Sequence, residues 1–346
     1  MEGMRGFAVF LVFLVHFLTL AAPWIAPDSA LSGVTDAIRK IGNIGVDLFF
    51  VLSGYLIYGS LISRQQPFLA FMRRRVVRIY PTFCVVFAIY LYLSFLRPQE
   101  SRMPPDAYDA WIYTLQNLAL LPGIFPITPF ITVAWSLSYE MFFYLAIPAM
   151  MLLLDLRARS AQWRIRLFFA LGVAILVGCS LFGGPVRLIM FITGILLHEA
   201  LRSGKIVPPR DGIAVLALLA GVLVNAVPFA LNSVGAGKLT IVALSFFITC
   251  YSCFRGQSAT LQRAFGWTPL RWLGNMSYSY YLVHGLTLKA AFVILAKLPP
   301  PAAHGLLFLG GLLPLMFAVT LISSGVLFLL VERPLSLKVS PRIVAA

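Results

Sequence analysis

The chain has 346 residues, of which 60% are hydrophobic and 11% charged, with a mean hydropathy of +0.91 and a net charge of +15. Soluble domains are nearer half apolar and a quarter charged, so this composition excludes an ordinary soluble protein and indicates a polytopic membrane protein. In such a protein the placement of positive charge matters more than its sum, and no nucleic-acid partner is expected. The four cysteines lie in apolar segments, so neither a disulfide framework nor a metal site is expected.

Apolar runs close to the length of a bilayer crossing can be counted along the chain. Ten are expected, which predicts an all-α bundle of about ten transmembrane helices. They cover residues 5–22, 44–63, 77–96, 136–154, 166–182, 186–201, 212–228, 238–254, 276–296 and 306–331. The first run lacks the small-residue pattern of a signal-peptide cleavage site, so it is expected to stay as the first helix.

Positive charge is distributed unevenly between alternate loops. If the N-terminus is cytoplasmic, eighteen Lys and Arg residues fall on the cytoplasmic face and seven on the other. The positive-inside rule therefore predicts that both termini are cytoplasmic, in agreement with an even number of helices. The one long connection, residues 97–135, is then an outer loop, in which Tyr108 to Leu121 could form a short interfacial helix. Residues 335–346 are the expected cytoplasmic tail.

Two ionisable residues interrupt the first apolar run. Arg5 lies near its start and His16 follows eleven residues later. On a helix this is about 16 Å of rise, and the two side chains return to within roughly 20° of the same face. An ionisable group at that depth costs on the order of 2–3 kcal/mol or more to insert, so it is expected to face a cavity and to have a function. Because histidine has the unperturbed pKa nearest neutrality, His16 is the candidate catalytic centre.

The second run reads GVDLFFVLSGYLI from residue 45. Asp47 lies about one turn inside its outer end. It either stabilises the helix N-terminus through the helix dipole or acts as a catalytic carboxylate that orients a histidine. Ser53 and Gly54 lie near the middle of the helix, where small residues allow close approach, so a packing role is favoured for them.

Residues 71–81 read FMRRRVVRIYP, with four arginines within six positions. Arg75 and Arg78 are three apart, and Arg74 and Arg78 four apart, so they share a helix face. One interpretation is that they set the topology and contact lipid headgroups. The other is an anion site, because the guanidinium fork matches a phosphate. With Arg5, these three arginines are the candidates for binding a phosphate-rich donor.

Polar residues also lie in the later apolar runs. Glu140 lies about one turn inside the outer end of its helix, where a carboxylate is costly without a role, so it is a further catalytic candidate. Trp135, Tyr281 and His284 are candidates for substrate contact, although a histidine in an apolar helix is often a satisfied core residue. Glu332 either ends the last helix near headgroups or contacts the arginine cluster.

The ionisable candidates fall into two layers according to their expected depth in the membrane. The inner layer contains Arg5, Arg74, Arg75, Arg78 and Glu332, and the middle-to-outer layer contains His16, Asp47, Glu140 and His284. The remaining histidines, His198 and His304, are expected to be solvated. The two layers suit a donor that arrives from the cytoplasm and an acceptor on the opposite face.

The chain resembles the membrane-bound acyltransferase-3 family, which O-acylates sugars and related acceptors. The resemblance covers nearly the whole chain through six motifs in the family's order. They are Arg5 and His16 with ten residues between them, GVDLFFVLSGYLI at 45–57, RRRVVRIYP at 73–81, WSLSYE at 135–140, SYSYYLVH at 277–284 and VERP at 331–334. The family pattern matches His16 to an essential histidine, Arg5 to its paired arginine, and Arg75 and Arg78 to an arginine pair.

The resemblance implies one integral-membrane acyltransferase domain over residues 1–346, expected to be a stand-alone member without the esterase-like domain that some relatives carry. The donor it implies is cytoplasmic acyl-CoA, usually acetyl-CoA, used as a co-substrate rather than held permanently. The implied acceptor is a saccharide, a glycolipid or a glycosylated small molecule, and the implied location is the inner (plasma) membrane. The alternative is a proton-coupled transporter or flippase of a polar or lipid-linked substrate, because intramembrane His, Asp and Glu also suit a proton relay.

Overall fold

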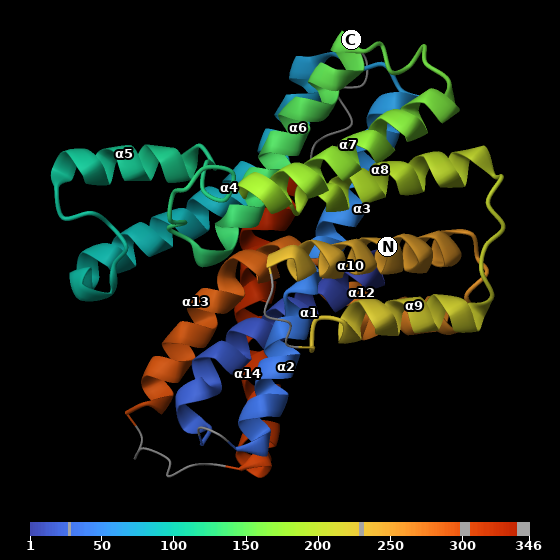
Figure 1. Cartoon of the computed structure of the whole chain (residues 1–346). Helices are drawn as coiled ribbons and strands as arrows, with labels where there is room; N and C mark the ends of the chain where they lie inside the picture. The colour runs from blue at the N-terminus through green and yellow to red at the C-terminus, as the bar shows by residue number, and fades with distance from the viewer. Residues whose placement is uncertain (27–28, 228–231, 298–304, 338–346) are drawn as a thin grey trace.

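The structure is a computed structural model that describes residues 1–26, 29–227, 232–297 and 305–337. The expected His304 and most of the expected tail (338–346) lie outside these ranges. The described chain is helical, with one isolated bridge between Pro122 and Phe125. The α-helices are α1 (Glu2–Ala21), α2 (Ala30–Gly42), α3 (Ile44–Ser63), α4 (Phe68–Leu96), α5 (Ala107–Leu118), α6 (Trp135–Leu153), α7 (Ala161–Phe182), α8 (Leu188–Ser203), α9 (Asp211–Leu223), α10 (Asn232–Phe254), α11 (Ala259–Gly266), α12 (Thr268–Asn275), α13 (Ser277–Leu295) and α14 (Leu306–Leu327). Short 3-10 turns are η1 (Ala22–Trp24), η2 (Pro98–Glu100) and η3 (Thr132–Ala134), and a π-helix, η4 (Phe328–Leu337), continues α14 (Figure 1).

The predicted all-α membrane architecture is confirmed, but the count of ten spans is not. Within the described ranges, eight stretches are long and apolar enough to cross a membrane. Helices α8, with 16 residues, and α9, with 13, are shorter. Helix α5 confirms the short helix expected in the long connection. Helix α4 begins at Phe68 rather than at residue 77, because the arginine-rich run is itself helical; arginine is a good helix former.

Helix α1 lies at the centre of the fold, against α2, α3, α12 and α13. Glycines allow two of these contacts to be unusually close. A Cβ on Gly6 would lie 1.9 Å from the carbonyl oxygen of Leu270, and one on Gly274 would lie 1.8 Å from that of Glu2. Because only hydrogen fits at these positions, α12 packs directly on the backbone of the first turns of α1. The short helix thereby fixes the end of α1 that carries Arg5.

Helices α3 and α8 make the most extensive helix–helix contact in the described chain. A Cβ on Gly54 would lie 2.2 Å from the Phe191 carbonyl oxygen, and one on Gly194 would lie 2.1 Å from that of Val51. The packing role expected for Gly54 is therefore confirmed, and it needs a second glycine on α8. This contact holds the functional residues of α3 in register with the rest of the bundle.

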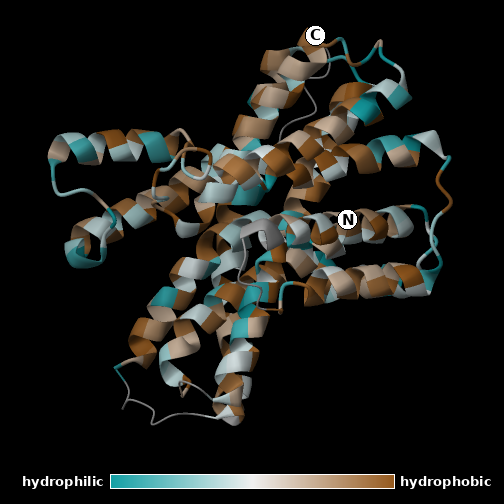
Figure 2. Ribbon diagram, viewed as in Figure 1, coloured by the Kyte–Doolittle hydropathy of each residue, from teal (hydrophilic) through white to brown (hydrophobic). Residues whose placement is uncertain are grey.

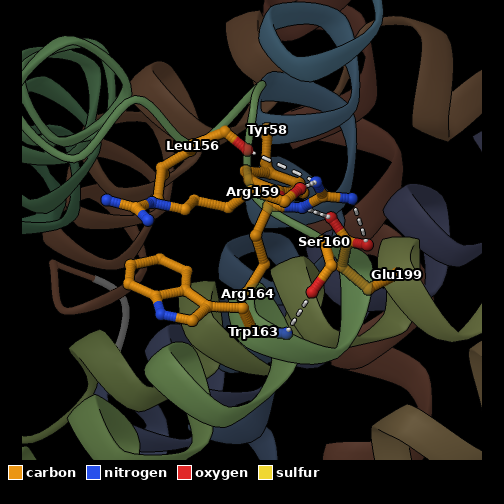
Figure 3. A network of polar contacts seen from close by, with 7 residues as sticks. All are labelled: Tyr58, Leu156, Arg159, Ser160, Trp163, Arg164 and Glu199. Carbon is orange, nitrogen blue, oxygen red and sulfur yellow. Dashed lines mark hydrogen bonds and ion pairs between the residues drawn. The ribbon is translucent and has the colours of Figure 1, made fainter.

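A buried ion pair joins α7 to α8 and α3 (Figure 3). Arg164 donates through Nε to Glu199 Oε1 at 2.7 Å and through Nη2 to Oε2 at 2.9 Å, and the Tyr58 hydroxyl donates to the same carboxylate. The Arg164 guanidinium also donates to the carbonyl oxygens of Leu156 and Arg159. A fork-to-fork pair of this kind fixes geometry as well as adding energy. The neighbouring His198 is not solvated as expected: its ring lies 5.5 Å from that of Tyr58.

Hydrophobic residues make up much of the length of the helices, while hydrophilic residues are frequent near helix ends and in the connections (Figure 2). Very little of the length of helix α7 is buried in the protein. Phe169 is 64% exposed and Phe182 is 87% exposed. A water-exposed surface of this size would be unfavourable, so these faces are in contact with lipid. The chain is a multi-pass membrane protein.

Candidate active site

A central cavity of about 180 Å³ lies where five helices meet. Helices α1, α3, α4, α6 and α13 each contribute polar residues to its wall, and apolar residues fill the spaces between them. The polar lining consists of Arg5, Ser53, Arg75, Arg78, Ser136, Glu140, Tyr144, Ser277, Tyr278 and Tyr281. Residues that are up to 276 positions apart in sequence therefore share one chamber inside the bundle.

Three of the four predicted donor-binding arginines line this cavity. They are Arg5 from α1 and Arg75 and Arg78 from α4. Arg74 is not brought to it: its side chain is exposed and donates to Gln66. Around α4, Arg74 lies about 100° from Arg75 and only about 40° from Arg78, so the face that Arg74 shares with Arg78 does not bring its side chain into the cavity.

The guanidinium of Arg75 is held by aromatic rings rather than by carboxylates. It lies over the rings of Phe71 and Tyr144, at 5.2 and 5.5 Å from their centroids. Its buried Nε has no hydrogen-bond partner, and neither has the buried hydroxyl of Ser277 on the same wall. Buried polar atoms are nearly always paired, so these two are groups that a bound polar molecule would satisfy.

Glu332 forms an ion pair with Arg78. Its Oε1 accepts from Arg78 Nη1 at 2.6 Å, and its Oε2 accepts from the backbone N and the Oγ of Ser279 at 3.0 and 2.5 Å. Of the two sequence interpretations of Glu332, contact with the arginine cluster is the one found. The carboxylate is fully buried, so the π-helix η4 ties α4 to the first turn of α13.

Glu140 is a cavity residue with two hydroxyl partners. Ser53 Oγ donates to its Oε1 at 2.8 Å and the Tyr144 hydroxyl donates to its Oε2 at 3.0 Å. Ser53 therefore binds a carboxylate, in addition to lying in the closely packed part of α3. Within the described residues no hydrogen bond joins Glu140 to His16.

Asp47 lies in a different environment from that of Glu140. Its carboxylate is almost completely buried and pairs with Arg187 Nη1 at 2.9 Å. Arg187 in turn lies over the ring of Trp135, with its Cζ 5.5 Å from the centroid. Asp47 thus fixes α3 to the start of α8, and no contact with His16 is found among the described residues. The sequence gives no signal for Arg187 beyond its position at a helix end.

His16 is half-buried and does not itself line the central cavity. Its ring lies 5.0 Å from that of His284 on α13, in an edge-to-face arrangement. His284 is fully buried; its Nδ1 contacts the Tyr280 carbonyl oxygen at 2.8 Å and its Nε2 has no partner. Tyr281, whose ring is 6.2 Å from that of His284, does line the cavity. These rings form a continuous path from the arginines to His16.

The structure therefore brings together most, but not all, of the candidate residues. Tyr281, whose hydroxyl lies 2.8 Å from Ser136 Oγ, lies between the cavity and the histidine pair. Tyr144 and Ser277 were not identified from the sequence, because a tyrosine or serine within an apolar helix gives no signal distinct from packing. The arrangement offers fixed positive charge for a polyanion at one end and two imidazoles for proton transfer at the other.

Comparison with known proteins gives a consistent result. The sequence model of a family described as an acyltransferase domain, acyltransferase-3, matches residues 1–328. Acyltransferase MdmB of Streptomyces mycarofaciens is 26% identical over 96% of this chain and 90% of the relative. Peptidoglycan O-acetyltransferase OatA of Listeria monocytogenes is 25% identical, and O-acetyltransferase OatA of Staphylococcus aureus strain NCTC 8325 is 30% identical. Each of these two matches covers 82% of this chain but only about half of the relative (48% and 49%). No solved structure matches the chain significantly.

Proposed function

Since this chain belongs to the acyltransferase-3 family, we propose that it moves an acyl group, most simply acetyl, from cytoplasmic acyl-CoA to a hydroxyl of a saccharide, a glycolipid or a glycosylated small molecule. Two named relatives, from Listeria and Staphylococcus, are O-acetyltransferases, and the first of them is named for peptidoglycan. The third is named only as an acyltransferase. Their names support O-acylation at the cell envelope as the class of activity.

One observation carries the proposal: Arg5, Arg75 and Arg78 converge on a single chamber inside a membrane protein. Glu332 already pairs with Arg78, but Arg5 and Arg75 have no ion-pair partner among the described residues, and half-buried guanidinium groups are costly there unless an anion binds them. Coenzyme A carries several phosphates, and arginine binds phosphate through charge-assisted hydrogen bonds. The unpartnered Nε of Arg75 and hydroxyl of Ser277 supply donors to the same ligand. These residues would hold the donor so that its thioester enters the bundle.

In the proposed reaction His16 takes the proton of an acceptor hydroxyl while that oxygen bonds to the acyl carbonyl carbon. The carbon–sulfur bond of the thioester then breaks, and the thiolate leaves with the proton. A second route, in which His16 accepts the acyl group before passing it on, satisfies the same geometry. His284 contacts His16 and is therefore the neighbour that orients it. Proton transfer of this kind contributes roughly 10²–10⁴ in rate.

We place the protein in the inner (plasma) membrane with both termini in the cytoplasm. The loops that this orientation assigns to the cytoplasm carry the larger share of Lys and Arg, as the positive-inside rule requires. The arginine-rich start of α4 then faces the compartment that contains acyl-CoA. The histidine pair lies deeper, toward the face on which envelope saccharides are found.

The test is transfer from radiolabelled acetyl-CoA by the purified protein in detergent, where transport between compartments is impossible. We expect acetyl-CoA consumption and product with an added saccharide acceptor, and loss of at least 10²-fold of this activity in His16→Gln. A protein that binds but never consumes acetyl-CoA in any acceptor mixture would favour the transporter alternative.

His198→Gln is the matched control, because it changes the same residue type at a position packed against Tyr55 and Tyr58, away from the cavity. We expect near wild-type transfer from this variant. Full activity in His16→Gln would remove His16 from the mechanism. Covalent label on the protein after incubation with acetyl-CoA alone, released by neutral hydroxylamine and absent in His16→Gln, would select the route through an acyl-histidine.

A further inference from the structure

A second cavity, of about 430 Å³, lies between the C-terminal parts of α4 and α13. Both helices run toward the same side of the molecule, away from the arginine-rich start of α4 (Figure 1). Arg97, at the rim of this second cavity, follows Arg75 by 22 positions, which is about 33 Å along a helix. The two cavities therefore serve opposite sides of the membrane.

Four cations and one carboxylate line the second cavity: Arg97, Arg102, Lys289, Lys297 and Glu100. Glu100 pairs with Arg97 at 3.0 Å and with Lys289 at 2.9 Å. Hydrogen bonds from Lys289 and Arg97 hold the pKa of Glu100 below its ordinary value, so the carboxylate stays ionised at neutral pH. The lining nonetheless keeps a net charge of +3, from four cations and one anion, and is a site for an anion.

This concentration of charge is unusual for its position in the fold. The face to which the second cavity belongs is the one that the positive-inside rule depletes of Lys and Arg. Lys289 lies within the membrane-spanning α13, six residues before its end at Leu295, or about 9 Å. An intramembrane lysine marks a functional site by default. Sequence reasoning missed it, although it is the only Lys, Arg, Asp or Glu in α13.

The rest of the wall is apolar and opens sideways. Leu93 on α4 and Ile294 on α13 line the cavity and are 37% and 67% exposed on the lipid-facing surface of the protein. Phe130 and Val293 extend this apolar wall. A site with a cationic rim and an apolar side that is open to lipid is complementary to an anionic amphiphile, not to a free sugar or a soluble anion.

The second cavity also adjoins the central one. Thr132 lines the second cavity and Ser136, one turn later, lines the first. On α13 the corresponding residues are Leu286 and Tyr281, five positions or about 7.5 Å apart. A thin wall therefore separates the two cavities. It includes the Tyr281 hydroxyl, which donates to the Val133 carbonyl oxygen at 3.0 Å.

We propose that the second cavity binds the phosphate group of a lipid-borne molecule, with Arg97, Lys289 and Lys297 on the phosphate and the hydrocarbon chain against the apolar wall. Binding itself does not depend on acyl transfer. We further infer that this lipid carries the acceptor saccharide. This step rests on the proposed function, and the position of the cavity next to Tyr281, His284 and His16 supports it.

The experiment measures binding to the purified full-length protein by native mass spectrometry with four probes: a polyprenyl phosphate, phosphatidylglycerol, phosphatidylcholine and inorganic phosphate. The triple variant Arg97→Gln, Lys289→Gln, Lys297→Gln is compared with a control that removes three exposed cations elsewhere, Lys40→Gln, Lys205→Gln, Arg210→Gln. We expect the first variant to bind phosphate-bearing lipid at least tenfold more weakly than wild type and the control to bind within about twofold. Lys297→Gln alone keeps both ion pairs of Glu100 and should weaken binding severalfold without affecting folding.

The probes distinguish the sources of the phosphate. Charge-dependent binding of the polyprenyl phosphate alone identifies a lipid-linked carrier, and equal binding of phosphatidylglycerol identifies a phospholipid headgroup; both support the site. Inorganic phosphate bound as tightly as the lipids would overturn the lipid part of the proposal. Equal binding by the triple variant and the control would overturn all of it. Lipid binding that is intact in a protein without transferase activity would overturn the proposed function and leave this site standing.

Discussion

His284 is the residue whose protonation the structure fixes most directly. A backbone carbonyl can only accept, so the 2.8 Å contact between Nδ1 and the Tyr280 oxygen requires the proton to be on Nδ1. In the neutral ring Nε2 is then an acceptor, buried without a partner beside His16. It is the group placed to share a proton with His16 or with the acceptor hydroxyl.

Two substitutions of His284 separate its two nitrogens. In His284→Asn the amide can still donate to the Tyr280 carbonyl, but nothing replaces Nε2, so we expect normal thermal stability and at least 10²-fold less transfer from acetyl-CoA. In His284→Gln the amide reaches the position of Nε2 and the contact with Tyr280 is lost, so we expect lower stability with more residual activity. Equal activity in the two variants would contradict a specific role of Nε2.

The charged residues of the site could be predicted from sequence where the helical period places them. Spacing identified Arg5, Arg75 and Arg78, which line the cavity, but the same spacing also selected Arg74, whose side chain is exposed. Apart from the contact of Glu332 with the arginine cluster, the partners of the carboxylates could not be predicted. Arg187 reaches Asp47 across 140 positions, and such a pairing is set by tertiary packing rather than by any local pattern.

At the scale of helices, Gly54 gives a direct test of the α3–α8 contact. In Gly54→Ala the new Cβ would lie 2.2 Å from the Phe191 carbonyl oxygen, so the helices must move apart. Overpacking of this kind costs typically 1–3 kcal/mol, and we expect a fall of several degrees in the thermal midpoint of the detergent-purified protein.

Gly172→Ala on α7 is the control for this prediction. Its Cβ would meet only the Ile192 Cγ2 atom, at an ordinary 3.5 Å. Alanine favours a helix by about 1 kcal/mol over glycine, so this variant should be as stable as wild type or more stable. Similar thermal midpoints for Gly54→Ala and Gly172→Ala would show that the close α3–α8 contact does not limit stability.

Most of the long apolar helices could be predicted within a few residues, because lipid leaves an unbroken apolar run as their signature. The exception is α4, which begins nine residues before the expected start. Helix α3 begins and ends where expected. The short helices α2, α11 and α12 were missed, since they are amphipathic and resemble loops when only apolar length is counted. These short helices position other elements. Helix α12, for example, fixes the start of α1, and the periodicity of the sequence gives no sign of that contact.

At the scale of the whole molecule, the orientation in the membrane can be tested by cysteine labelling. In a variant without its four native cysteines, Asp109→Cys on α5 and Lys205→Cys after α8 are both at exposed positions, which the proposed topology assigns to opposite faces of the membrane. We expect a membrane-impermeant maleimide to label Asp109→Cys in intact cells, and Lys205→Cys only after permeabilisation.

Gln99→Cys and Arg210→Cys form a second pair that should repeat this result, because they lie in the same two connections. Labelling of Lys205→Cys in intact cells, with protection of Asp109→Cys, would show that the protein has the opposite orientation in the membrane. It would also place the arginine-lined entrance away from cytoplasmic acyl-CoA, so the proposed donor would have to be abandoned along with the topology.

The ion pair between Arg164 and Glu199 sets an order of events during synthesis. Arg164 leaves the ribosome 35 residues before its carboxylate partner, so α7 reaches the translocon with its guanidinium still uncompensated. Arg164 lies in the first turn of α7, where its long side chain can keep the guanidinium in the headgroup layer until the partner is present. Only when α8 emerges can the charge move inward, which makes this corner of the protein dependent on two helices entering the bilayer as a unit.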